Sequence, residues 1–228
     1  MIKAIELVDA VSLSKKQCPY PIRTELKYAT TDNFIGKPLP GYDPNAADLC
    51  IMTPKAAYAL CKIQTYLNEN GFSLLVLDAY RPLRTVKYFT EWFKQPIKDE
   101  IELARKQLHY PHLEKTDLPK LGYVAADVSR HCFGYAVDLT LMHLHNPTEL
   151  NMGAIFDYFD PLSSARATAN EIGAEAFHNR QYLTKIMQQF NFLPYEEEFW
   201  HFDYHEHEAG QPFDIPIDIH LKQKLAKS

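Results

Sequence analysis

The stretch from residue 53 to residue 80 constrains the fold most, because a helical pattern passes directly into a strand pattern there. Its first part reads TPKAAYALCKIQTYLNENG, in which Thr53 suits the N-cap of a helix and the proline after it suits the first helical position. Alanine, leucine and isoleucine recur on one face at helical spacing, and Gly71 is typical of the residue that follows a helix. The apolar run after it, FSLLVLDAY, predicts a buried strand.

Helical and strand patterns are mixed through the rest of the chain. RTVKYFTEWFKQ (84–95) predicts a helix, and NEIGAEAFHNRQYLTKIMQQF (170–190) predicts a second long helix whose start Gly173 weakens. AVDLTLM (136–142) alternates, so its aspartate lies on the opposite strand face from the neighbouring valine and leucines. The aromatic-rich EFWHFDY (198–204) is typical of another strand.

These patterns lack a regular βαβ repeat and therefore indicate an α+β fold. We expect a single domain over residues 1–228, with a central antiparallel sheet and helices packed on one side of it. The chain is 46% hydrophobic, which suffices for one sizeable core, and it carries no Ser/Gly-rich linker or internal repeat that would divide it. Residues 96–128 have a mixed composition and are predicted to form a long surface loop, of the kind that is often functional.

Charge and composition exclude several kinds of partner. The net charge is −5 and no basic stripe exists, which argues against nucleic acid and against an anionic membrane surface. No stretch approaches the roughly 20 apolar residues of a membrane span, and the first residues lack the long apolar core of a signal peptide. The four cysteines form no C-x-x-C pair, so we expect reduced thiols and a cytoplasmic location. A periplasmic location stays open if a leader was removed, and the sequence leaves homo-oligomerisation open.

Two separated acid–histidine pairs predict a metal site. His131 and Asp138 are seven residues apart in SRHCFGYAVDLTL, which would separate them by about 10 Å on a straight helix and place them on opposite faces of a straight strand. Both can reach one ion, with bonds of roughly 2 Å, only if the chain turns back between them, and Gly134 makes such a turn easy. His201 would add a third ligand from EFWH. Two imidazoles, one carboxylate and an open position are typical of a catalytic zinc site rather than a structural one.

Glu198, three residues before His201, would act as the general base beside a zinc-bound water. The helical H-E-x-x-H signature is absent, so the site would have a different architecture. The competing interpretation is a surface histidine, a capping aspartate and a core aromatic strand, because ten histidines generate many accidental combinations. The histidines of the H-x-H pairs at 143–145 and 205–207 are expected to be solvated.

The two motifs together resemble those of a known family. SRHCFGYAVDLTL followed by EFWH resembles the S-x-H-x(6)-D and E-x-x-H motifs of the zinc D-alanyl-D-alanine dipeptidases, the vancomycin-resistance type and its bacterial relatives. Several ordered blocks are far more specific than one motif, and here they run along nearly the whole chain. These further blocks are KYATTDNFIGKPLPGY (27–42), LDAYRP (77–82), GYVA (122–125), MGAIFDYFD (152–160) and NRQYLTKIM (179–187).

The resemblance implies an α+β fold shared with zinc D,D-carboxypeptidases and the Hedgehog signalling domain. It implies that one zinc ion per chain is bound by His131, Asp138 and His201, and that Glu198 is the catalytic base. Arg81, in DAYRP, resembles the arginine that stabilises the tetrahedral intermediate. The competing interpretation of this arginine is a turn-capping ion pair with the aspartate three residues before it.

The resemblance also implies which residues contact the substrate. Asp157, in MGAIFD, falls where the family binds the free ammonium of its substrate, and the competing interpretation is a structural cap. Ser129 and Tyr28 fall at substrate-contact positions. Two features depart from the family pattern: Phe199 stands where tryptophan is usual, and the stretch 81–131 is a few residues longer, which would alter the lid of the pocket.

The implied activity is hydrolysis of the D-Ala-D-Ala dipeptide or close D,D-dipeptides, with this small molecule as the partner. Two alternatives stay open: a zinc D,D-carboxypeptidase acting on peptidoglycan stem peptides, and an inactive zinc-binding interaction domain. A mere binder needs neither a general base nor an oxyanion donor, so Glu198 and Arg81 favour an enzyme.

Overall fold

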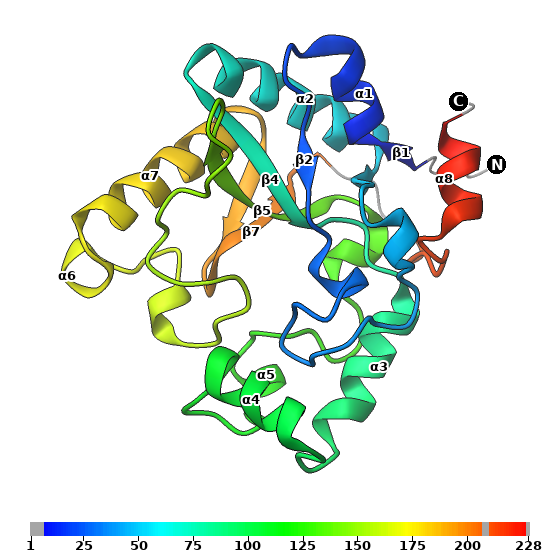
Figure 1. Cartoon of the computed structure of the whole chain (residues 1–228), viewed down its shortest axis with the longest axis vertical. Coiled ribbons are helices and arrows are strands. Elements are labelled where there is room, and N and C mark those ends of the chain that lie inside the picture. The colour runs from blue at the N-terminus through cyan, green and yellow to red at the C-terminus, as the bar shows by residue number, and fades with distance from the viewer. Residues whose placement is uncertain (1–6, 207–209, 227–228) are drawn as a thin grey trace.

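The computed structural model describes residues 7–206 and 210–226. At its centre, five strands form one sheet in the order β2-β4-β5-β7-β6 (Figure 1). β4 pairs antiparallel with β5, β5 with β7 and β7 with β6, whereas the short β2 runs parallel to β4. In numerical order, the bounds of β2, β4, β5, β6 and β7 are Arg23–Thr24, Phe72–Asp78, Ala136–His143, Phe192–Tyr195 and Glu198–Tyr204.

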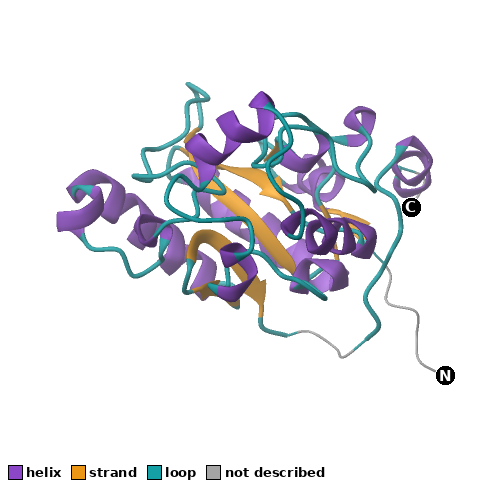
Figure 2. Cartoon of the chain, turned by 90° about the horizontal axis from the view of Figure 1, so that it is seen from below, coloured by secondary structure: helices purple, strands orange, loops and turns teal. Residues whose placement is uncertain are grey.

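The sheet confirms the predicted α+β class and corrects two details of it. The central strands are antiparallel as expected, but β2 makes the sheet mixed. Figure 2 shows the strands running through the middle of the molecule with helices on more than one side, so the expected one-sided packing was wrong. A second, two-stranded antiparallel sheet joins β1 (Val8–Asp9) to β3 (Ile51–Met52).

The helix and strand predicted over residues 53–80 form as expected. α2 (Pro54–Glu69) begins after Thr53, and Gly71 follows its end with a φ of 82°, in the left-handed region that favours glycine. α2 contacts β4, and α1 (Ala10–Gln17) packs beside α2. The apolar face of α2 is buried and includes the four residues that the spacing predicts, Ala56, Leu60, Ile63 and Leu67.

Gly173 breaks the second long helix that the sequence predicts. α6 (Ala169–Ile172) ends at Gly173 and α7 (Ala174–Gln189) begins immediately after it. The φ of Gly173 is 87°, which lies outside the helical range and interrupts the hydrogen-bond ladder. α7 contacts β5, β6 and β7, so it covers the end of the sheet opposite to β2.

The prediction of a long loop over residues 96–128 was wrong. This segment contains α4 (Glu100–His109) and α5 (Asp117–Lys120). Together with α3 (Leu83–Phe93), these helices lie at the end of the molecule away from α1 and α2 (Figure 1). A buried ion pair of 2.7 Å between Lys115 Nζ and Glu102 Oε2 ties the segment after α4 to the helix itself.

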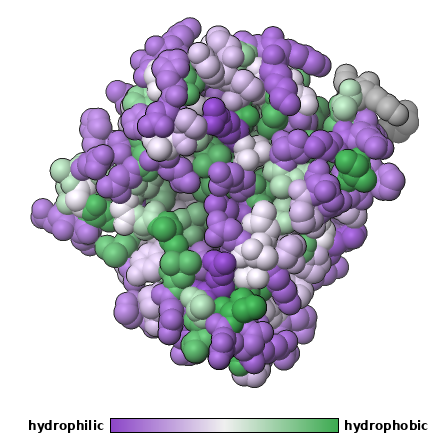
Figure 3. All heavy atoms as spheres, viewed as in Figure 1, coloured by the Kyte–Doolittle hydropathy of each residue, from purple (hydrophilic) through white to green (hydrophobic). Residues whose placement is uncertain are grey.

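Most of the buried apolar residues of the described ranges form one large cluster around the sheet. Figure 3 shows hydrophilic residues over most of one face, with hydrophobic residues in short stretches between them. All four cysteines are buried and free. Among residues 7–206 and 210–226, every helix falls short of the length and apolarity that crossing a bilayer requires.

Two polar residues are buried on β5 within this apolar setting. Asp138 is 2% exposed and Thr140 is 3% exposed. Burying a carboxylate is costly unless it is paired, so the partners of Asp138 mark the point of the sheet where a site can be expected.

Candidate active site

The strand register brings three polar residues into one row. On β5, Asp138 lies directly opposite His201 of β7 on one side and opposite Asp78 of β4 on the other. Directly opposed residues of antiparallel strands present their side chains to the same face. The sheet therefore brings together Asp138 and His201, which are 63 positions apart in the chain.

A tight turn places His131 beside this row. The 3-10 helix η3 (Arg130–Phe133) follows Ser129, whose hydroxyl accepts a hydrogen bond of 3.3 Å from the His131 amide. Gly134 ends η3 with a φ of 75°, and β5 begins two residues later. The predicted turn is thus present, and it returns the chain so that His131 meets Asp138.

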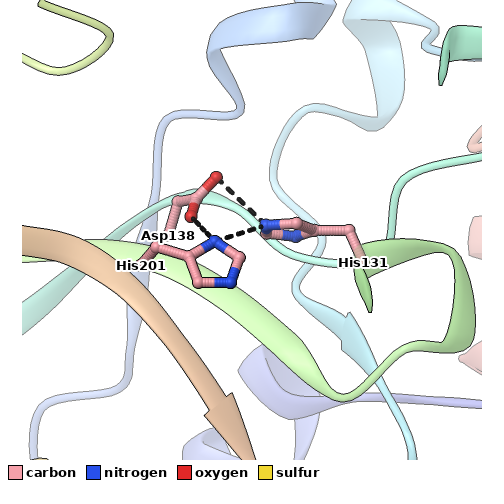
Figure 4. Close-up of side chains that lie close together, drawn as sticks. All are labelled: His131, Asp138 and His201. Carbon is pink, nitrogen blue, oxygen red and sulfur yellow. Dashed lines mark hydrogen bonds and ion pairs between the residues drawn. The ribbon is translucent and has the colours of Figure 1, made fainter. Parts of the chain in front are cut away.

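Figure 4 shows His131, Asp138 and His201 facing one another from η3, β5 and β7. His131 Nε2 lies 3.2 Å from His201 Nδ1 and 3.3 Å from Asp138 Oδ2. Asp138 Oδ1 lies 3.0 Å from His201 Nδ1. Two atoms bonded to one tetrahedral zinc ion at about 2.0–2.2 Å lie roughly 3.3 Å apart. The spacing of the three groups therefore fits a zinc ion between them.

The outer nitrogens of the two imidazoles determine which nitrogens face the centre. His131 Nδ1 donates a hydrogen bond of 2.6 Å to the Ala79 carbonyl, so Nε2 carries the lone pair in the neutral ring. His201 Nε2 lies 3.3 Å from Asp203 Oδ1, and Asp203 Oδ2 forms an ion pair of 3.2 Å with Arg130. The lone pairs of His131 Nε2 and His201 Nδ1 then point toward each other beside the Asp138 carboxylate, and they repel one another unless a cation lies between them. Outer hydrogen bonds of this kind are typical of metal-binding histidines.

The electrostatics of the triad favour positive charge. Burial opposes ionisation of Asp138, but the imidazoles of His131 and His201 hold its pKa well below the usual range. Burial likewise opposes the cationic form of His201, but hydrogen bonds to Asp138 and Asp203 raise its pKa to about 10. The three side chains thus favour a positive charge between them, as a bound metal cation would supply.

Glu198 lies beside the triad at the start of β7. Its Oε2 atom is 3.9 Å from His201 Nδ1, and the residue is 7% exposed. Burial raises the pKa of Glu198 to about 8, and the negative charge of Asp138 adds to this while His201 and Arg81 oppose it. A carboxylate in this setting binds a proton more readily than an ordinary glutamate does.

Arg81 is fixed by two buried carboxylates. Its Nε donates a hydrogen bond of 2.9 Å to Asp78 Oδ2, and its Nη2 donates one of 3.3 Å to Asp138 Oδ2. Its guanidinium carbon lies 4.9 Å from the centre of the Tyr28 ring. The Tyr42 hydroxyl donates a 2.7 Å hydrogen bond to Asp78 Oδ1. The ion pair with Asp78 is therefore present, but it is buried and directs the guanidinium toward the triad instead of capping a surface turn.

Asp157 is a buried carboxylate with an incomplete set of partners. It is 3% exposed, and its Oδ1 accepts a hydrogen bond of 3.3 Å from the Tyr28 hydroxyl. Its Oδ2 is buried and has no hydrogen-bond partner within the described ranges. Burial, together with the negative charges of Glu198 and Asp138, raises the pKa of Asp157 well above its usual range. A cationic group placed at Oδ2 would supply the missing partner.

All the residues that the sequence predicts for the site line a single cavity of about 330 Å³. This volume is near the lower end of the range for ligand pockets, about 300–1,000 Å³. Part of the wall comes from residues 119–130, and the Tyr195 hydroxyl donates a 3.0 Å hydrogen bond to the Gly122 carbonyl of this wall. The predicted residues that line the cavity are Tyr28, Arg81, Ser129, His131, Asp138, Asp157, Glu198 and His201.

The histidines of the competing H-x-H pairs do not join the triad. His143, His145 and His205 are exposed, as expected for solvated histidines, and His207 lies outside the described residues.

Comparison with known proteins gives the family of the chain. A family model described as D-ala-D-ala dipeptidase matches residues 13–218. The chain belongs to this family. A protein named D-alanyl-D-alanine dipeptidase from Enterococcus faecalis is 40% identical over 181 residues, which are 79% of this chain and 85% of that protein. Proteins of the same name from Enterococcus faecium and Streptomyces coelicolor are 36% and 39% identical, each over 86% of this chain and 93% of its own length.

Asp203 was not predicted from the sequence as a residue of this site. Its contact with His201 is a side-chain contact that no local motif shows, although Asp203 stands within the EFWHFDY block, where a search for a second carboxylate could have found it. Asp78 was considered only as a surface partner of Arg81, whereas the structure buries this ion pair beside the triad.

Proposed function

We propose that this chain hydrolyses the D-Ala-D-Ala dipeptide with one zinc ion held by His131, Asp138 and His201. The observation that carries the proposal is a single cavity with the metal-binding triad at one place and a buried, incompletely paired carboxylate, Asp157, at another. The first arrangement suits peptide-bond hydrolysis, and the second suits a free ammonium group. The name shared by the relatives supports the same substrate.

The residues that would hold the ion are His131 through Nε2, His201 through Nδ1, and the Asp138 carboxylate. When bound, zinc supplies a Lewis acid for the scissile carbonyl and lowers the pKa of water. The protein contributes the fixed orientation of the two rings through Ala79 and Asp203.

Glu198 would move the proton. Its carboxylate accepts a proton from the attacking water and then transfers it to the nitrogen of the leaving D-alanine, so the same group acts first as base and then as acid. Its burial and its raised pKa, about 8, make it a better proton acceptor than an exposed glutamate. The peptide bond breaks between the carbonyl carbon and this nitrogen, and the water oxygen stays on the new carboxylate.

Arg81 would stabilise the negative charge that develops on the carbonyl oxygen. Asp78 and Asp138 use two of its five N–H donors in the described part of the chain, and the guanidinium lines the cavity. A donor that is held in place before the reaction costs no reorganisation when the charge forms.

Asp157 would bind the ammonium of the substrate, with the Tyr28 hydroxyl holding its other oxygen. Ser129 lies on the same cavity wall, where it would contact the substrate while its hydroxyl caps η3. A substrate with a blocked amine would leave the buried Asp157 without a cationic partner. We therefore favour a dipeptidase over a carboxypeptidase that acts on longer peptides.

Three further expectations belong to this proposal. The described residues contain one His/Asp/His group of metal-binding geometry, which supports one zinc ion per chain. The large common core supports a single domain across residues 1–228. Four buried, free cysteines favour a reducing compartment, and we propose the cytoplasm.

One assay tests the proposed function. Amine release is measured from D-Ala-D-Ala, L-Ala-L-Ala and a pentapeptide ending in D-Ala-D-Ala, with and without a zinc chelator. We expect chelator-sensitive hydrolysis of D-Ala-D-Ala alone. Cleavage of the pentapeptide at a comparable rate would favour a D,D-carboxypeptidase, and zinc binding without hydrolysis of any peptide would indicate an interaction domain.

A further inference from the structure

His109 lies at the end of α4, outside the cavity, and is hydrogen-bonded to the chain that carries Asp157. Its Nδ1 donates a hydrogen bond of 3.0 Å to the Asp157 main-chain carbonyl. Its own main-chain carbonyl accepts a 2.7 Å hydrogen bond from the Phe159 amide. One residue of α4 thus holds the 157–159 segment at two points. The histidine is 4% exposed, so both bonds are shielded from water.

Asp157 needs such support because its conformation is unfavourable in two ways. Its φ is 57°, in the left-handed region that residues other than glycine rarely adopt. Its carboxylate is also buried with Oδ2 unpaired within the described ranges. A loop free to relax would rotate this carboxylate toward water, because burial of an incompletely paired carboxylate is costly.

The chemistry of His109 suits a fixed hydrogen-bond donor. Since the Asp157 carbonyl is an acceptor, Nδ1 must carry the hydrogen, and in the neutral ring Nε2 is then an acceptor. Burial and the nearby Arg105 lower the pKa of His109 to about 4, although hydrogen bonding to Asp157 and the charge of Asp32 oppose this. The ring is therefore neutral at ordinary pH and keeps its Nδ1–H on the Asp157 carbonyl.

The helix that carries His109, α4, is itself held in place. Glu102 of α4 accepts a hydrogen bond of 3.3 Å from the Trp92 indole of α3 and pairs with Lys115. The Lys115 ammonium lies 4.2 Å from the centre of the Trp92 ring. These contacts fix α4 to α3, so His109 acts from a rigid element on the 157–159 segment.

We propose that His109 is a positioning residue that sets specificity for the free ammonium by holding the Asp157 main chain. The inference rests on the proposed function, because it assigns the ammonium to Asp157. It gives the 96–128 segment a role in substrate selection, carried out from outside the cavity through one main-chain hydrogen bond.

The test compares three substitutions of His109. Asn places an amide N–H near the position of Nδ1, Gln extends past it, and Leu removes the donor. We expect H109L and H109Q to raise KM for D-Ala-D-Ala by roughly tenfold, which is the worth of about one hydrogen bond, with kcat within about threefold of the wild type. H109N should stay close to the wild type. The ratio of kcat/KM between D-Ala-D-Ala and N-acetyl-D-Ala-D-Ala should fall in H109L and H109Q and be kept in H109N.

The matched control is Tyr110→Phe. Tyr110 is the next residue, is fully buried and has a hydroxyl without a hydrogen-bond partner in the described ranges, so this change alters the same helix end without touching Asp157. We expect it to leave KM and the substrate ratio unchanged. Melting temperatures of all variants separate loss of fold from loss of position.

The results separate the two levels of the proposal. If the wild type discriminates between free and acetylated dipeptides but H109L and H109Q keep the wild-type KM and ratio, the role of His109 is overturned and the proposed function stands. If the wild type itself cleaves both substrates alike, the proposed function fails and the inference fails with it. If H109L does not fold, H109N and H109Q still test the inference, because equal KM values for D-Ala-D-Ala in these two variants would overturn it.

Discussion

Asp138 and Asp157 are both buried carboxylates that line one cavity, yet their surroundings shift their pKa values in opposite directions. Asp138 lies between two imidazoles and an arginine, and the imidazoles hold its pKa well below the usual range in spite of burial. Asp157 has the Tyr28 hydroxyl on one oxygen and no partner on the other within the described ranges, and burial raises its pKa well above the usual range.

The difference separates two ways of preparing a site. The side chains of the triad contact one another and are held from outside by Ala79 and Asp203, so their geometry is fixed before any substrate arrives. The carboxylate of Asp157 is held in place by its main chain but lacks an ionic partner. It would therefore favour binding of a ligand that carries a positive charge. Under the proposed function, one end of the cavity would carry out the chemistry and the other would select the substrate.

The largest expected effect comes from removing the carboxylate at the chemical end. Asp138→Asn keeps the size of the side chain but removes the charge that the two imidazoles and Arg81 face. We expect zinc content to fall from about one ion per chain to a small fraction, with activity lost in parallel. Elemental analysis of purified protein checks this, with Asp157→Asn as the control that should retain zinc. Full zinc occupancy in Asp138→Asn would remove the distinction between the two aspartates.

Glu198→Gln should impair catalysis without impairing metal binding at the same end of the cavity. The amide cannot accept the proton of the attacking water, so kcat should fall by about 10²–10⁴-fold while zinc is retained. Zinc content and kcat are measured on the same preparation. Loss of zinc in this variant would instead make Glu198 a ligand.

Arg81→Ala should lower kcat by about 10²–10³-fold, the usual effect of removing one oxyanion donor, with zinc retained. Arg81→Lys is the matched variant, and we expect it to restore little, because a lysine cannot reproduce the two-sided contact with Asp78 and Asp138. Steady-state kinetics on D-Ala-D-Ala check both variants. A near-normal kcat in Arg81→Ala would leave this arginine with a structural ion pair alone.

The smallest effect is expected at the outer contact of the triad. Asp203→Asn weakens the hydrogen bond that orients His201 and removes the ion pair with Arg130. Zinc affinity should fall about 10–100-fold, as is common for such outer partners. Competition with a chelator of known affinity measures this directly, and Arg130→Gln, which keeps the Asp203 carboxylate, should have a lesser effect. Unchanged affinity in Asp203→Asn would show that the triad needs no support from outside.

The parts of this fold that the sequence predicts are those with local signals. The α2 helix, the buried β4 strand and the alternating β5 strand follow from periodicity and from capping residues, and the turn at Gly134 follows from the need to bring His131 to Asp138. The family motifs then name the site residues, and the structure brings all of them to one cavity.

The parts that were wrong depend on contacts between distant segments. α4 has an N-cap at Asp99 and acidic residues in its first turn, which are sequence signals of a helix start, but its apolar Ile101, Leu103 and Leu108 are exposed and add nothing to the core. The parallel pairing of β2 with β4 joins two residues of β2 to a strand about fifty positions later, a contact that leaves no periodic pattern. The sequence predicts that Gly173 weakens the start of one helix, and its positive φ divides that helix in two.

The most direct test of the contrast between Asp138 and Asp157 is the ratio of kcat/KM for D-Ala-D-Ala and N-acetyl-D-Ala-D-Ala, measured on the wild type and on Asp157→Asn. An acetylated substrate leaves the buried carboxylate unpaired at a cost of several kcal/mol, so the wild type should favour the free dipeptide by roughly a thousandfold or more. Asp157→Asn should narrow this ratio, mainly by impairing the free dipeptide, with zinc content unchanged. Comparable rates on the two substrates by the wild type would contradict the assignment of Asp157 to the ammonium and, with it, the dipeptidase function.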